Sequence, residues 1–158
     1  MKVLAVKANN SKHSFEVMTA HGSLDFPYSK AELSPTAADP IAELWVDEEL
    51  ACEGFAYLLD SGREGVVLLD QVLYYNQDPA FMRDLLLYEL TVQAQKSLKT
   101  SPLSRREIIR RLGTSPAQFY RLLDQTNYRK SVDKVLELLY VLDCDVELVV
   151  QPCSKAAS

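Results

Sequence analysis

Cationic side chains are concentrated in one short segment of this 158-residue chain. The stretch SRREIIRRLGTSPAQFYRLLD, residues 104–124, contains five arginines, and residues 101–134 carry a net charge of +5. Residues 1–100 carry a net charge of −7, and the whole chain carries −5. The chemistry that such a cluster offers is ionic contact with phosphate groups. A basic block in an acidic chain therefore indicates a polyanionic partner, and nucleic acid is the leading candidate.

Residue types that support catalysis or metal binding do not occur at the spacings that such sites need. His13 and His21 lie in or beside expected turns, and neither has a Cys, Ser or paired acid at motif spacing. The acidic run at residues 47–49 has no histidine or further carboxylate at a ligand spacing, so a solvated surface is the simpler interpretation. We therefore expect no enzyme activity, no catalytic or metal site and no cofactor.

Length and hydropathy indicate a folded chain outside the membrane. The 158 residues, 47% of them hydrophobic, suffice for one domain or two small ones. The longest apolar runs fall far short of the roughly 20 residues that span a bilayer, and the N-terminus lacks a signal-peptide pattern. Three cysteines without CxxC spacing are expected to be thiols. These features favour a cytoplasmic localisation.

The first half of the chain predicts a small α+β unit that begins with strands. Runs rich in Val, Phe, Thr and Leu occupy residues 3–7, 14–19 and 22–26, and turn residues separate them. The last two runs are expected to form a hairpin.

A loop and a second hairpin are expected to complete this unit. Residues 34–40 predict a loop, and residues 42–57 show mixed helical spacing. Apolar runs then flank residues 61–64, where Gly62 and Gly65 can supply a turn. We expect a domain of unknown role over residues 1–76, with antiparallel hairpins.

A long helix is expected to open a second domain over residues 77–158. Asp78 can cap free N–H groups, and Pro79 suits the first helical position because its missing donor costs nothing there. An apolar stripe then continues to Lys99, and Pro102 prevents further helix.

Two short helices joined by a tight turn are predicted next. Ser104 and Glu107 have the spacing of a reciprocal capping box, and Gly113 is expected to end the first helix in a left-handed conformation. Ser115–Pro116 opens the second helix immediately afterwards. The pattern is that of a helix-turn-helix.

A third helix and an extended stretch are expected to follow. The third helix covers residues 131–143, with Ser131 as its cap. Residues 144–150, CDVELVV, place Val146, Leu148 and Val150 on one face of an extended chain.

The segment LSRREIIRRLGTSPAQFYRLLD, followed by SVDKVLELLYVLDCDVELVV, resembles the lambda-repressor-like Cro/cI helix-turn-helix proteins. These include transcription-factor-type antitoxins. The resemblance covers residues 79–150 and rests on Gly113 at the turn, on Phe119 and Leu122 at inward positions, and on LYVLDCDVELVV. Where the family usually has alanine, this chain has Ile109, a larger residue at the crossing of the two helices.

Residues 1–75 more loosely resemble a small α+β domain family that has no established activity and occurs alone or fused to such a helix-turn-helix. The expected fold class is therefore α+β, with a small α+β domain followed by an all-α lambda-repressor-like domain.

The resemblance implies that the second helix of the motif lies in the major groove of DNA, with its N-terminal residues facing base edges. Gln118 would then contact adenine, Arg121 guanine and Ala117 a thymine methyl group. Residues at the start of the first helix and cations that flank the motif would contact phosphates. The predicted DNA-binding residues are Arg105, Arg106, Ser115, Ala117, Gln118, Tyr120, Arg121, Arg129, Lys130 and Lys134.

The leading interpretation is a prokaryotic-type transcriptional regulator that binds double-stranded DNA with sequence specificity. One short helix reads few bases, so a homodimer is expected, with residues 78–99 and the VELVV stretch, residues 146–150, as candidate contacts. The alternative is an antitoxin-like interaction protein whose N-terminal domain binds a toxin or another protein. No membrane partner is expected.

Overall fold

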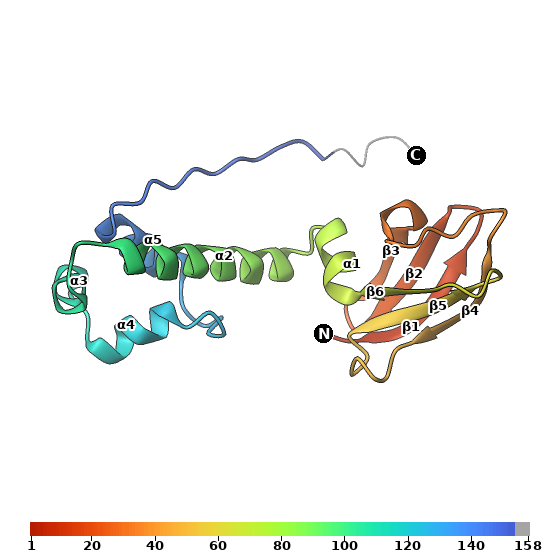
Figure 1. Cartoon of the computed structure of the whole chain (residues 1–158), viewed down its shortest axis with the longest axis horizontal. Coiled ribbons are helices and arrows are strands. Elements are labelled where there is room, and N and C mark those ends of the chain that lie inside the picture. Colours follow the sequence, from red (N-terminus) through yellow and green to blue (C-terminus); the bar gives the residue numbers. More distant parts are fainter. Residues whose placement is uncertain (154–158) are drawn as a thin grey trace. The chain divides into compact units, whose positions relative to one another are not determined.

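The computed structural model describes residues 1–153 and divides the chain into two compact units (Figure 1). The N-terminal unit is Met1–Met82, and the C-terminal unit begins at Arg83. The fold is α+β, because the strands of the described residues all lie in the first unit and four of the helices lie wholly or mostly in the second. The division falls a few residues beyond the expected boundary at residue 76. Phe81, at the start of a long helix, still packs against the core of the first unit.

Two antiparallel three-stranded sheets build the N-terminal unit. The first sheet contains, in spatial order, β1 (Val3–Asn9), β2 (Ser14–Thr19) and β3 (Gly22–Pro27). The second contains β4 (Ile41–Val46), β5 (Gly54–Leu59) and β6 (Glu64–Leu68). A short 3-10 turn, Tyr28–Lys30, follows β3. The three predicted N-terminal strands and both predicted hairpins, β2–β3 and β5–β6, are confirmed.

The helical expectation for residues 42–57 is wrong, because this segment forms most of β4 and β5. Trp45 pairs with Ala56 across the two strands. Between the strands, the carboxylate of Asp47 accepts hydrogen bonds from the backbone N–H groups of Glu49 and Leu50, at 2.9 and 3.3 Å. The turn then needs positive φ angles at two successive residues, 53° at Ala51 and 61° at Cys52, which a helix cannot contain.

Helix α1 (Leu69–Tyr75) was not expected, since the apolar run that forms β6 continues without a break into it. The side-chain oxygen of Gln71 accepts a hydrogen bond from the backbone N–H of Leu68 at 2.8 Å, which marks the start of the helix. Val72 and Leu73 are buried on its inner side. Packing of this face against the sheets therefore decides the conformation of the segment.

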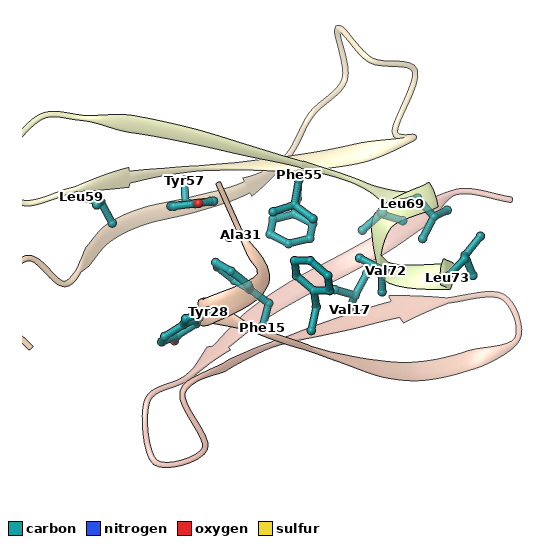
Figure 2. Packing of buried hydrophobic residues seen from close by; sticks show 13 residues of the cluster. Phe15, Val17, Tyr28, Ala31, Phe55, Tyr57, Leu59, Leu69, Val72 and Leu73 are labelled. Carbon is teal, nitrogen blue, oxygen red and sulfur yellow. The ribbon is translucent and has the colours of Figure 1, made fainter. Parts of the chain in front are cut away.

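Aromatic rings form the centre of the first core. Figure 2 shows Phe15 of β2 and Phe55 of β5 pointing toward one another, with side chains of α1 beside them. The centroid of the Phe15 ring lies 4.9 Å from that of Phe55 and 5.0 Å from that of Tyr57. The Tyr57 hydroxyl donates a hydrogen bond to the carbonyl of Leu33. The Tyr57 ring occupies the place where a Cβ atom at Gly65 would lie, so β6 needs glycine there.

Four helices form the C-terminal unit, and all four expected helices are confirmed. They are α2 (Pro79–Thr100), α3 (Arg105–Leu112), α4 (Pro116–Leu123) and α5 (Val132–Val141). Within residues 1–153, none of the helices is long and apolar enough to cross a membrane. The buried cluster of this unit draws on every helix and contains Leu87, Ala94, Ile108, Phe119, Val135, Leu138, Leu139 and Leu142.

The predicted helix starts are confirmed with two differences. The Asp78 carboxylate accepts from the N–H of Phe81 at 2.9 Å, and the Ser104 hydroxyl accepts from the N–H of Glu107 at 3.1 Å. The reciprocal half of the capping box is not formed, because the Glu107 carboxylate contacts arginines instead. Ser131 precedes α5 as expected, but its hydroxyl caps no N–H group of that helix.

Candidate nucleic-acid interface

A left-handed residue joins α3 to α4. Gly113 has φ 63° and ψ 33°, and its N–H bonds to the carbonyl of Arg110 at 3.1 Å. The Ser115 hydroxyl then accepts from the N–H of Gln118 at 3.2 Å and starts α4. Ile108 and Phe119 are fully buried on the inner sides of the two helices. Ile109, the residue that departs from the expected alanine, is half-buried and packs against the same cluster.

The outer side of α4 carries the predicted base-contacting residues. Ser115, Ala117, Gln118, Tyr120 and Arg121 are all exposed. Ser115 is partly occupied as the cap of α4. The side chains of Gln118 and Arg121 form no hydrogen bond within residues 1–153, so their donors and acceptors face solvent. This leaves an amide and a guanidinium on the same exposed side of one short helix.

Two of the five arginines are held by an acid and three are not. Arg110 and Arg111 both bond to the Glu107 carboxylate, at 2.9 and 3.0 Å. Hydrogen bonds from Arg110 and then Arg111 lower the pKa of Glu107 to about 2. Among the described residues, Arg105, Arg106 and Arg121 form no ion pair.

Arg105 also contacts the exposed ring of Tyr120. The guanidinium carbon lies 5.9 Å from the ring centroid, and one guanidinium nitrogen lies 3.4 Å from the Tyr120 hydroxyl. This contact links the start of α3 to the outer side of α4. The Tyr120 ring in turn packs edge-on against Phe119, with centroids 5.3 Å apart.

A hollow of about 630 Å³ lies beside the second half of α4. It brings together five of the predicted DNA-binding residues, which come from α4, from the loop after it and from the start of α5. They are Gln118, Arg121, Arg129, Lys130 and Lys134. Lys134 pairs with Glu137 at 3.1 Å, and Arg129 has no acidic partner within residues 1–153. Within the described part of the chain, Asp124 is the one acidic residue that lines the hollow, so cations outnumber carboxylates next to both predicted base readers.

Lys130 differs from the predicted surface cation. Only 8% of the residue is exposed, and its ammonium donates to the carbonyls of Leu122 and Asp124 at 3.0 and 2.7 Å. Burial lowers the pKa of Lys130, and the nearby Asp124 carboxylate opposes this shift. The ammonium of Lys130 is thus bound at the end of α4, and its expected role as a backbone clamp on DNA stays a prediction.

Side chains from outside α4 bind every carbonyl from Arg121 to Asp124. Asn127 donates to Arg121 at 3.2 Å, and Gln95 of α2 donates to Leu123 at 2.7 Å. Lys130 supplies the remaining two bonds. The last carbonyls of a helix lack partners within it, and a glycine in the left-handed conformation often satisfies them. Here Asp124 follows α4 with φ −77°, so these side chains replace that arrangement.

The residues that hold this helix end are not recognisable from the sequence alone. Arg83 of α2 adds to the same network, because its guanidinium donates to the carbonyl of Tyr128 at 3.0 Å and to that of Lys130 at 3.5 Å. The absence of glycine after α4 is the one signal in the sequence that a different cap was needed. Partners such as Gln95 lie too far away along the chain to be inferred from spacing.

The N-terminal unit contains no comparable cluster. His13 and His21 lie in turns beside strands, as expected. In the part of the chain that the structure describes, no group of three His, Cys, Asp or Glu side chains is arranged to hold a metal ion.

Comparisons with known protein families, with curated proteins and with solved structures found no match to this chain.

Proposed function

We propose that this protein is a sequence-specific DNA-binding regulator of the prokaryotic type, in which α3 and α4 form a lambda-repressor-like helix-turn-helix. One observation carries the proposal: Gln118 and Arg121 are exposed on α4 beside a hollow lined by cations. The double-stranded DNA partner, the cytoplasmic location, the homodimeric state and the absence of enzyme chemistry all belong to this proposal.

Base recognition would fall to the outer side of α4. An amide can donate to and accept from the edge of adenine, and a guanidinium can bind two acceptors of guanine. Ala117 offers a methyl group of the size that contacts thymine. Both ends of α4 are fixed, by Ser115 at the start and by Lys130, Asn127 and Gln95 at the end. A fixed helix presents its side chains in one geometry, which base discrimination requires.

Phosphate binding would fall to cations that no carboxylate of residues 1–153 neutralises. Arg105 and Arg106 lie at the start of α3, and Arg129 lies in the loop before α5. Contacts to phosphates orient a protein on the duplex and carry no sequence information themselves. The N-terminus of α5 borders the same hollow, and helix N-termini favour anions. Arg129 and the start of α5 lie beside both predicted base readers, and Arg105 reaches the outer side of α4 through Tyr120.

Selection from a random pool of duplex DNA with the full chain tests the proposal. We expect enrichment of one short motif that contains guanine and adenine positions. The motif should weaken when Arg121 is changed to alanine and should persist when Arg63, on the N-terminal unit, is changed in the same way. A pool without enrichment at low salt would contradict the proposal and would favour a protein partner for the basic surface.

A further inference from the structure

The chain beyond α5 is an extended segment without a partner (Figure 1). Within residues 1–153, no residue from 145 to 153 takes part in a hydrogen bond. The side chains of Val146, Leu148, Val149 and Val150 are 49%, 80%, 74% and 83% exposed. Extended backbone with unpaired N–H and C=O groups and exposed β-branched residues is a template for pairing with another strand.

The same segment borders an apolar groove within the C-terminal unit. The groove has a volume of about 520 Å³, and Leu86 and Leu90 of α2 and Leu136 of α5 contribute to its wall. Val146 and Leu148 line it from the side of the extended segment. Glu147 also lines the groove. The segment therefore borders apolar surface but is only partly covered by it, and its backbone N–H and C=O groups are open.

We propose that residues 145–151 of two copies of this chain pair as antiparallel strands, with Leu148 opposite Leu148 of the second copy. This register places Val146 opposite Val150, so one face of the ribbon is apolar throughout. It also places Glu147 opposite Val149 and Asp145 opposite Gln151. Directly opposed side chains interact at about 5 Å, and this register opposes no two carboxylates.

The neighbouring registers oppose like charges or bring proline into the strand pair, and both destabilise it. A ribbon centred on Glu147 would set two carboxylates opposite each other, and one centred on Val146 would set Asp145 opposite Glu147. Like charges in directly opposed positions destabilise a strand pair. A ribbon centred on Val149 would bring Pro152 opposite Val146, and proline lacks the N–H that a ladder uses. The charge and proline pattern of the segment thus selects Leu148 as the centre.

The second copy also accounts for the groove. With Val150 of the second copy opposite Val146, an apolar side chain comes to the mouth of the groove that Val146 lines. A dimer with its two-fold axis at Leu148 would contain two copies of α4, one for each half-site of a DNA operator. The inference names the contact of the proposed homodimer, but the pairing itself needs no DNA.

Sedimentation of the full chain without DNA tests this ribbon. We expect a species of twice the 17.8 kDa chain mass at micromolar concentration. Val149→Glu places a carboxylate opposite Glu147 and should weaken the dimer by about tenfold or more, whereas Val149→Lys should leave it intact or tighter. Position 149 is 74% exposed in the single chain, so neither change should affect folding. A monomeric parent, or equal effects of the two variants, would overturn the inference.

Disulfide formation gives an independent readout of the register. In a Cys153→Ser background, Leu148→Cys should cross-link the two copies on oxidation. Glu147→Cys is the matched control, because residues 147 of the two copies would be diagonal neighbours, beyond the distance that a disulfide bridges. Cross-linking through position 147 but not 148 would overturn the register. A dimer with these properties that selects no DNA sequence would contradict the proposed function while supporting the ribbon.

Discussion

The ammonium group of Lys130 donates a hydrogen bond to the carbonyl oxygen of Leu122 at 3.0 Å. A second bond joins the same ammonium to the carbonyl of Asp124 at 2.7 Å. A buried cation thus stabilises the C-terminus of α4, where unpaired carbonyls concentrate partial negative charge. The ammonium is engaged by these two carbonyls, so we expect it to make no contact with DNA.

Replacing Lys130 with methionine should destabilise the fold without changing the number of phosphate contacts. The variant keeps the apolar stem and leaves two carbonyls with fewer partners, which costs about 1–3 kcal/mol in unfolding free energy. Urea unfolding measures this loss, and Lys134→Met, at an exposed position, is the control. In DNA titrations of the folded variant, the salt dependence should match that of the parent. A flatter salt dependence in the Lys130→Met variant would mean that Lys130 does contact a DNA phosphate.

Acid should weaken the C-terminal unit through Glu107. Arg110 and Arg111 hold the pKa of Glu107 at about 2, below its ordinary value of 4.5. A carboxylate with a lowered pKa in the folded state stabilises that state above its unfolded pKa. The contribution is therefore complete above about pH 4.5 and is lost as the pH falls toward 2. Unfolding midpoints should show the parent exceeding Glu107→Gln at pH 6, with the gap narrowing below about pH 4.5 and closing only as the pH approaches 2. A gap independent of pH would exclude this ion-pair cluster as its source.

Two substitutions should show whether Arg121 recognises a base or only supplies positive charge. Alanine at this position is expected to relax preference at one base pair by about 1–3 kcal/mol. Lysine should keep the salt dependence but lose that preference, because an ammonium lacks the two-pronged geometry of a guanidinium. Competition titrations against single-base variants of the selected site measure both. Full preference in the lysine variant would assign Arg121 to phosphate contact.

Gln118→Ala should relax preference at a different base pair by a similar amount, since the two side chains lie one helical turn apart on α4. The same competition titrations, with variants of the neighbouring base pairs, provide the measurement. Unchanged preference at every position would remove Gln118 from the reading surface.

Salt titrations should identify the phosphate contacts. Each phosphate neutralised on duplex DNA adds about −0.9 to the slope of log affinity against log salt. Changing Arg106 or Arg129 to alanine should therefore flatten the slope by about one contact while weakening all sequences alike. Arg63→Ala removes a charge from the N-terminal unit and serves as control. Unchanged slopes in both test variants would mean that neither arginine contacts the DNA backbone.

The helices of the C-terminal unit could be predicted from sequence because their determinants are local. Asp78, Ser104 and Ser115 each bond to an N–H three residues ahead. Gly113 ends α3 through its own backbone conformation. The hairpins have the same property, since the residues of a turn decide it. Exposure of Gln118 and Arg121 followed from helical periodicity once Phe119 and Leu122 were placed inward.

Tertiary structure decided the features that depend on atoms far away in the chain. β4 is a strand because it pairs with β5, and its sequence spacing alone favoured a helix. Lys130 is an internal cap because the chain after α4 returns its ammonium to Leu122 and Asp124, and Gln95 reaches Leu123 from another helix. A local hydrogen bond is encoded within three or four residues, whereas burial depends on everything that packs around a side chain. The sequence therefore shows that residue 130 carries a positive charge. Only the fold shows which carbonyl oxygens accept its hydrogen bonds.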